Sequence, residues 1–445
     1  MRRLIGGAMA MAVLMAGAID AAPAHAEDGK LDIDFYLRAR VETISGEFRP
    51  GLPATNTALL LRTEIRAEYD AGPIRIGGEV FDARAYFQRS RSSINTAEVN
   101  AVEPVQAYLK TDFSNRATVT LGRFTINQGS RRLIARSIFR NSTNAFTGAR
   151  IDLSDRQGDH AVLFWTMPQT RLPDDPAGIA DNAVELDRER LGVQFFGGSV
   201  TSRKLGSGTT VEAYLYRLAE HDAPGILTRD RRLWTPGLRV YRPPARGKTD
   251  FEVEAAWQGG TTRGSARAND LADLPVSAWF AHAHIGHGFA HAWSPRLAVQ
   301  FDIASGDRSS TRYTRFDPLF GARVFEFGPS SLYGPISRSN LISAEARVEL
   351  SPSKRWDGYV AVRPLWLQSS SDSFGATGVR DASGAAGRYA GTQVDARARY
   401  WIRPSHVRLA LGYANLFKGD FLTTASNAPA TGDTHYGYGE ITLTL

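Results

Sequence analysis

The sequence contains no cysteine among its 445 residues. This excludes disulfides, thiolate catalysis and cysteine metal sites. Beyond its N-terminal segment, the chain also lacks any run of roughly 18 apolar residues, which a membrane-spanning helix needs. Its mean hydropathy is −0.27. Its formal net charge of +7 is mild and does not point to a nucleic acid partner. If this protein enters a membrane, it must do so as a closed β-barrel, which satisfies every backbone group in lipid.

The N-terminal segment has the composition of a secretory signal peptide. Arg2 and Arg3 precede an apolar run at 4–19, and Ala-His-Ala at 24–26 is a small-x-small cleavage site. A membrane anchor is the alternative, but the run is short and rich in glycine and alanine. We predict that residues 1–26 are removed and that residues 27–445 form a single exported domain.

Alternation of apolar and polar residues dominates the rest of the chain. In LDIDFYLRARVE at 31–42, the odd positions are apolar and the even positions are mostly charged. Side chains of a strand point alternately to two faces, so each such segment has one apolar and one polar face. No long stretch shows the helical period. We predict about eighteen strands, at 31–43, 58–70, 73–87, 104–112, 117–126, 146–153, 160–167, 190–198, 209–219, 233–242, 249–258, 276–285, 296–304, 340–350, 356–367, 391–401, 406–415 and 435–445.

The connections between these strands nearly alternate between short and long. Short turns such as 71–73 and 114–116 contrast with long segments such as 127–145, 168–189 and 305–339. Outer-membrane barrels have short periplasmic turns and long extracellular loops, whereas a soluble sandwich has no reason to sort its loops in this way. The prediction is therefore an all-β protein, a transmembrane antiparallel barrel of about 18 strands in a Gram-negative outer membrane. Its apolar faces meet lipid and its charged faces line the lumen.

Aromatic residues near the strand ends fit the girdles of such barrels. This set is Trp234, Tyr241, Trp279, Trp293, Trp356, Trp366, Tyr400, Trp401, Tyr413, Phe417, Tyr436 and Tyr438.

Residues 123–150 carry six arginines and no acidic residue. These are Arg123, Arg131, Arg132, Arg136, Arg140 and Arg150. The stretch spans the end of one strand, a long loop and the start of the next. Guanidinium groups stay charged and bind carboxylates and phosphates through paired hydrogen bonds. Folded into the lumen, the loop predicts a positive constriction for an anionic saccharide; folded outward, its arginines would instead bind lipopolysaccharide phosphates.

The same stretch resembles the signature of the alginate export family of outer-membrane proteins. The matching positions are Gly122, Arg123, Gly129, Arg132, Leu133, Ile134, Arg140, Asn141, Phe146, Gly148 and Arg150. FDPLF at 316–320, GPISRSN at 334–340 and NLFKGDF at 415–421 resemble later segments of the family. The resemblance implies an 18-stranded barrel that passes polyuronate outward through an arginine-rich constriction. The chain departs from the family in having Thr147 where members often have an acid, and in its short late turns.

The predicted inward strand faces carry charges of both signs. The pore is expected to be lined by Arg38, Arg40, Arg62, Arg66, Arg397 and Arg399. The stretch 123–150 adds Arg123, Arg131, Arg132, Arg140 and Arg150 to this lining. Acids such as Glu64, Glu252 and Glu345 share these faces, which predicts cross-strand ion pairs that stiffen the wall. Anion preference would then come from 123–150, with contributions from Arg84, Arg89 and Arg91.

Two kinds of metal site compete with this interpretation. HAHIGHGFAH places His282, His284, His287 and His291 close together, but a solvated periplasmic turn is the simpler expectation. The acids of 172–182 and 268–274 (Asp174, Asp175, Asp181, Asp270 and Asp273) fit no EF-hand spacing. We therefore expect no metal and no cofactor.

Three functions remain open at the level of sequence. The first is a channel for anionic saccharides, with outer-membrane lipid, lipopolysaccharide, the saccharide and periplasmic export components as partners. The second is a general or uptake porin for other small solutes. The third is a soluble exported β enzyme such as a polysaccharide lyase, although no nucleophile elbow or comparable local signature supports catalysis.

Overall fold

The computed structural model describes residues 30–156, 158–203, 205–308 and 310–445. The predicted signal peptide at 1–26 lies outside the described residues.

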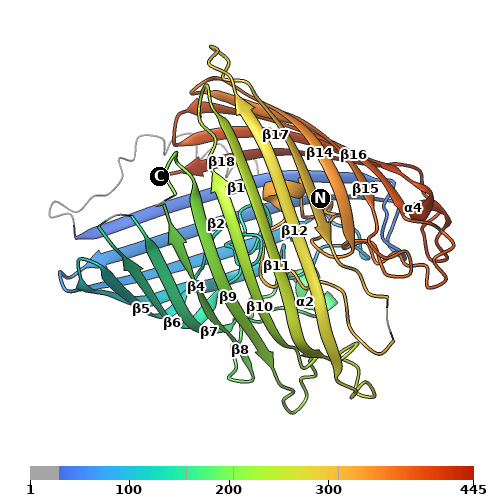
Figure 1. The fold of residues 1–445 in the computed structure, drawn as a ribbon, viewed down its shortest axis with the longest axis horizontal. Helices are drawn as coiled ribbons and strands as arrows, with labels where there is room; N and C mark the ends of the chain where they lie inside the picture. The colour runs from blue at the N-terminus through green and yellow to red at the C-terminus, as the bar shows by residue number, and fades with distance from the viewer. Residues whose placement is uncertain (1–29, 157, 204, 309) are drawn as a thin grey trace.

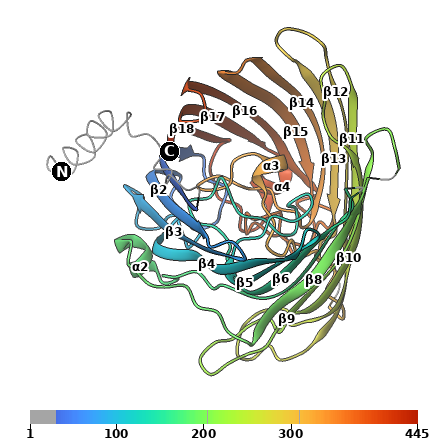
Figure 2. The same cartoon turned by 90° about the vertical axis from the view of Figure 1, so that its left-hand side faces the viewer.

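Eighteen strands form one antiparallel sheet that closes on itself (Figures 1 and 2). They are β1 (Leu31–Ser45), β2 (Thr55–Asp70), β3 (Ile74–Tyr86), β4 (Asn100–Ser114), β5 (Ala117–Phe124), β6 (Phe146–Ser154), β7 (His160–Pro168), β8 (Val193–Ser202), β9 (Thr210–Glu220), β10 (Arg232–Arg242), β11 (Thr249–Thr262), β12 (Leu274–Gly288), β13 (Arg296–Ala304), β14 (Leu341–Ser353), β15 (Trp356–Trp366), β16 (Tyr389–Arg403), β17 (Val407–Lys418) and β18 (Thr434–Thr444).

The barrel closes because β1 pairs with both β2 and β18. The register between β1 and β18 runs from Tyr36 opposite Thr444 to Ser45 opposite His435. Each strand from β2 to β17 pairs with its two sequence neighbours. The predicted fold class is confirmed, and each predicted strand overlaps an observed one. The largest differences in strand bounds are four residues: β4 begins at Asn100 rather than at residue 104, β8 ends at Ser202 rather than at 198, and β11 ends at Thr262 rather than at 258.

The two faces of the wall follow the alternation in the sequence. Val41 is 50% exposed and Ile65 is 52% exposed on the outside, while Arg40 and Arg62 are 0% and 3% exposed on the inside. A protein in water would bury the apolar face, so the opposite arrangement is that of a wall surrounded by hydrocarbon.

Short and long connections alternate around the whole barrel. One end has turns such as 71–73 and 115–116, and the other has the long loops. Three helices lie in those loops: α2 (Pro176–Asp181), α3 (Val324–Phe327) and α4 (Asp420–Thr424). Among the described residues, the structure has no helix with the length and apolarity to span a membrane.

The long loops pack into the barrel instead of leaving it open. Figure 2 shows α3 and α4 inside the ring of strands. One apolar cluster joins Phe327, Leu332 and Tyr333 of the loop 305–340 to wall residues that include Ile44 and Leu416. A second cluster packs Ile126, Leu133 and Ile134 against β6 to β12. Loop side chains therefore occupy part of the lumen. Their packing determines which polar groups of the loops and the wall come into contact.

Two aromatic residues that were expected in the outer girdle lie inside the barrel. Tyr436 is 1% exposed, and its ring stacks on Tyr333 with centroids 5.2 Å apart. Tyr438 is also buried. The physical reason is the two-residue period of β18, because Ile441 on the outside requires the even-numbered residues to point inward.

Candidate functional site

The arginine-rich loop between β5 and β6 (residues 125–145) folds into the lumen. Gly122, in β5 shortly before the loop, has φ +115°. A Cβ at Gly148, in β6 shortly after the loop, would collide with the Trp165 carbonyl. Glycine is therefore needed at both positions. Inside the barrel, the loop pairs with the segment FDPLF. The Phe320 N–H donates to the Leu133 carbonyl at 2.9 Å, and the Ala135 N–H donates to the Phe320 carbonyl at 3.1 Å. Two segments of the family resemblance therefore meet in space.

The wall holds the tip of this loop by hydrogen bonds to its backbone. Arg38 donates to the Ile138 carbonyl at 2.8 Å, and Arg38 and Arg62 both donate to the Arg140 carbonyl at 3.2 and 3.1 Å. Asn141, which is fully buried, donates to the carbonyls of Leu61, Arg84 and Glu98. These bonds fix the loop position and use Arg38 and Arg62 as structural donors.

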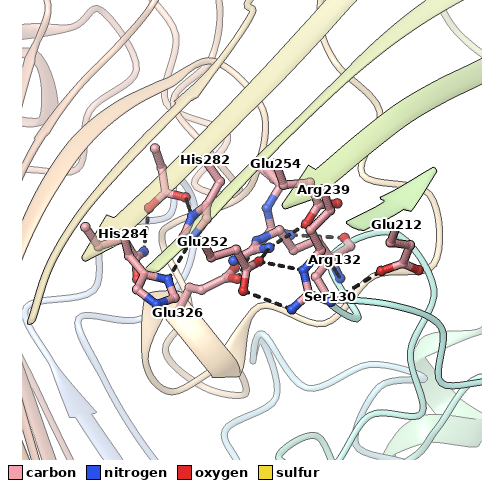
Figure 3. A network of polar contacts seen from close by, with 12 residues as sticks. Ser130, Arg132, Glu212, Arg239, Glu252, Glu254, His282, His284 and Glu326 are labelled. Carbon is pink, nitrogen blue, oxygen red and sulfur yellow. Dashed lines mark hydrogen bonds and ion pairs between the residues drawn. The ribbon is translucent and has the colours of Figure 1, made fainter. Parts of the chain in front are cut away.

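Arg132 lies in a buried network of carboxylates (Figure 3). It forms ion pairs with Glu252 and Glu254 of β11 and with Glu326 of α3, the last at 2.6 Å. Arg239 of β10 also pairs with Glu252, at 2.9 Å. Burial alone would lower the pKa of Arg132, but the carboxylates of Glu254 and Glu252 outweigh that effect and raise the pKa. Arg132 therefore links its own loop and the loop 305–340 to β11, and carboxylates fully compensate its charge.

The network continues through the loop 305–340 to β13 and β15. Arg338 pairs with Glu326 and donates to the Arg132 carbonyl at 3.0 Å. Burial and the neighbouring Arg132 lower the pKa of Arg338 to about 10. Arg363 of β15 donates to the Glu326 carbonyl and pairs with Asp302 of β13 at 3.1 Å.

Several other predicted pore arginines also have acidic partners. The pairs are Arg40 with Glu42, Arg66 with Asp34, Arg123 with Glu103 and Glu189, Arg150 with Asp152, and Arg397 and Arg399 with Asp357. Arg136 of the signature stretch bridges Glu64 and Glu79. Much of the positive charge expected at 123–150 is thus neutralised by the wall and by other loops.

Glu189 lies beside Thr147, where the family often has an acid. Its carboxylate accepts a hydrogen bond from Thr147 Oγ1 at 3.4 Å and pairs with Arg123 at 2.8 Å. Arg123 lies directly opposite Thr147 in the β5–β6 register. The loop 169–192 therefore supplies a carboxylate at the position where the sequence departs from the family.

Several loop arginines have no carboxylate within 4 Å in the described part of the chain, and burial lowers the pKa of four of them. Two belong to the predicted loop, Arg131 and Arg140, and two come from other loops, Arg171 and Arg323. Arg131 lies over the Phe325 ring at 3.6 Å. Arg323 donates to the carbonyls of Gly334 and Ile336. Sequence reasoning missed Arg171 and Arg323, because only contacts between loops distinguish them from other arginines.

Arg140 and Arg171 are held together by one acceptor. Both donate to Asn144 Oδ1, at 3.3 and 2.7 Å. Burial and the neighbouring charges of Arg171 and Arg323 lower the pKa of Arg140 to about 9. Burial also lowers the pKa of Arg171. The site therefore concentrates positive charge without a carboxylate in direct contact, and Glu98 and Asp187 act on it only from a greater distance.

These two guanidinium groups line a cavity of about 420 Å³ where four long loops meet. Its wall includes Thr96, Asn144 and the segment 319–321. The one carboxylate of its lining, Asp174, is exposed. Such a volume lies within the range of small-molecule pockets. The arrangement can bind a carboxylate, phosphate or sulfate group through charged hydrogen bonds.

Three of the four histidines lie in β12 and not in the solvated turn expected from the sequence, whereas His291 is exposed in the turn 289–295. His282 is buried in β12 and hydrogen-bonds Asp302 at 2.8 Å, while His284 faces Asp250 at 3.2 Å. His287 also lies within β12, which extends to Gly288. The acids on neighbouring strands that pair with these histidines are remote in sequence. Over the described residues, no group of three or more histidines and acids could hold a metal ion.

Two of the loop acids considered for calcium have structural contacts. Asp175 caps α2 by accepting from the N–H groups of Ala177 and Gly178, and Asp270 accepts from Ser265 Oγ at 2.8 Å.

Comparison with known proteins agrees with this architecture. The sequence model of the alginate export family matches residues 30–433. No curated protein matches the chain by sequence. Among solved structures, Pseudomonas aeruginosa OccK2 in complex with glucuronate has a TM-score of 0.56 at 12% identity, with 93% of this chain and 97% of that chain covered. P. aeruginosa OpdK with vanillate gives 0.57 at 10% identity, with 93% and 98% covered. Acinetobacter baumannii OccAB1 gives 0.58 at 12% identity, with 96% and 98% covered.

At these identities the solved structures establish the fold alone, whereas the family match spans most of the chain. Both the fold and the family are those of outer-membrane channels and not of enzymes. The chain therefore belongs to the alginate export family and is a channel of the Gram-negative outer membrane.

Proposed function

We propose that this channel passes anionic saccharides, uronates among them, and that Arg131, Arg140 and Arg171 select for them in the lumen. The observation that carries the proposal is the set of loop guanidinium groups without a carboxylate partner among the described residues. Arg140 and Arg171 also face a common cavity. Arg123, Arg132 and Arg150 contribute less to selectivity, because acids already compensate their charges.

Burying the unpaired charge of these arginines costs free energy. A buried ion is destabilising unless a counter-ion and hydrogen bonds compensate it. The lowered pKa values of Arg140 and Arg171 express that cost. A passing carboxylate offsets it for as long as the anion is bound, so the lumen favours anions over cations and over neutral sugars.

The ligands of similar channels support this chemistry. OccK2 was solved with glucuronate and OpdK with vanillate, and both ligands are carboxylates. The family is named for the export of alginate, which is a polymer of uronates.

Bilayer recordings test the proposal. Under a KCl gradient, the reversal potential of the wild-type pore is expected to show anion preference. Substituting glutamine at Arg131, Arg140 and Arg171 together is expected to remove most of it. The matched control is Arg66→Gln, because Arg66 is paired with Asp34 and lies outside the cluster. A wild-type pore that prefers cations, or a triple variant with unchanged selectivity, contradicts the proposal.

A second candidate is uptake of small organic acids. It is favoured by the loop 305–340, which carries α3, packs against the inner wall and leaves less room for a polymer (Figure 2). Liposome swelling separates the two functions. Equal swelling rates with glucuronate and with uronate oligomers favour polysaccharide passage, whereas swelling with the monomer alone favours a small-solute porin.

A further inference from the structure

The outer wall has a hollow on its membrane-facing side. It spans β6 to β10, has a volume of about 900 Å³, and is lined mainly by apolar side chains. Small outward residues create it, namely Ala149, Ala161, Gly198 and Ala213. A Cβ at Gly198 would collide with the Val162 carbonyl and the Leu163 side chain, so the hollow cannot be filled at that point.

A row of aromatic residues with one guanidinium group borders this hollow. The strand register places Trp165 beside Phe196, Phe196 beside Arg217 and Arg217 beside Trp234. Trp165 and Trp234 are exposed on the outside. The Arg217 guanidinium lies 4.8 Å from the Trp234 ring centroid. Tyr216 and Leu218 are buried, so Arg217 lies on the outer side of the wall.

The row lies at the long-loop end of the strands. Trp165 is near the end of β7 at Pro168, and Arg217 is near the end of β9 at Glu220. In outer-membrane barrels the long loops are extracellular, so the row is at the level of the outer-leaflet head groups. Aromatic side chains favour this interface.

The positive charge of Arg217, at the long-loop end of β9, has little compensation from acidic residues. Arg217 has no acidic partner within 4 Å among the residues the structure describes, and its one hydrogen bond goes to the Arg232 carbonyl at 3.3 Å. Arg232 also lies on the outside and pairs with Asp230 at 2.8 Å. An apolar hollow beneath two guanidinium groups matches a molecule that has a hydrocarbon chain and an anionic head.

We propose that this face binds a phosphorylated lipid of the outer leaflet, with one acyl chain in the hollow and a phosphate on Arg217 and Arg232. Hydrocarbon is the solvent of this face of the wall, and a phosphate accepts the paired hydrogen bonds that arginine donates. The site is separate from the lumen and does not depend on what the channel transports.

Native mass spectrometry of the full-length barrel in detergent micelles tests the site. The probe is bis-phosphorylated lipid A, with phosphatidylethanolamine as the comparison lipid. We expect one lipid A molecule to be retained by the wild-type barrel. Arg217→Gln should weaken retention about tenfold, the loss expected for one charged hydrogen bond. Ala213→Phe should weaken it by filling the hollow.

The matched control is Ala398→Phe, an outward alanine of β16 on the other side of the barrel, which should behave as the wild type. Heat-modifiable migration in electrophoresis confirms that each variant is folded. Equal retention of both lipids, or retention that neither Arg217→Gln nor Ala213→Phe changes, overturns the proposal. A dimer that buries this face and carries no lipid overturns it as well.

Discussion

Glu98 provides a quantitative test of the charge cluster in the lumen. It lies in the loop 87–99, is 2% exposed, and accepts a hydrogen bond from the Asn95 N–H at 3.3 Å. Burial and the neighbouring carboxylate of Glu42 raise the pKa of Glu98 from 4.5 to about 7, although Arg140 opposes the increase. The charged groups that act on it are Glu42 and Arg40 of β1, with Arg49, Arg140, Arg171 and Arg323 of the loops.

The magnitude follows from linkage between protonation and folding. One pKa unit corresponds to about 1.36 kcal/mol, so a pKa of about 7 makes the ionised form about 3 kcal/mol less favourable in the folded state. Because the folded pKa is the higher one, this contribution to stability is complete below pH 4.5. It is lost as the pH rises through about 7.

The perturbation is Glu98→Gln, which removes the titration. The free energy of unfolding of this variant relative to the wild type should increase by about 3 kcal/mol between pH 5 and pH 8. Urea unfolding of the barrel in lipid vesicles, followed by tryptophan fluorescence, measures it. Glu185→Gln, in the loop 169–192, is the control for loss of a loop carboxylate. A difference from wild type that is the same at both pH values would refute the reasoning.

Two further predictions concern how the arginine-rich loop is held. Asn141→Ala removes hydrogen bonds to three backbone carbonyls, so the free energy of unfolding should fall by about 3 kcal/mol; an unchanged urea midpoint contradicts this. Arg132→Met leaves the buried carboxylates of Glu252, Glu254 and Glu326 without their common partner and should cost about 3–5 kcal/mol. Adding Glu326→Gln should recover part of that loss, and a double variant less stable than Arg132→Met argues against the network.

The barrel was predictable because its signal is local. The two-residue alternation at 31–42 fixes which side chains of β1 face lipid, and the lengths of the connections fix the end from which the long loops emerge. The same alternation places Tyr436 and Tyr438 inside the barrel, although their aromatic character alone predicted the opposite.

The charge balance of the lumen depends on residues that are distant in sequence. Arg132 meets Glu252 and Glu254 only because the loop after β5 crosses the lumen to β11. Arg171, which has no sequence feature that distinguishes it, meets Arg140 because both bind Asn144.

The sequence by itself determined the fold, the two faces of the wall and the family. Only the tertiary structure decided which arginines are neutralised and which remain available to an anion. Alternation is a property of neighbouring residues, whereas compensation of a charge depends on which carboxylates the closed barrel brings within hydrogen-bonding distance.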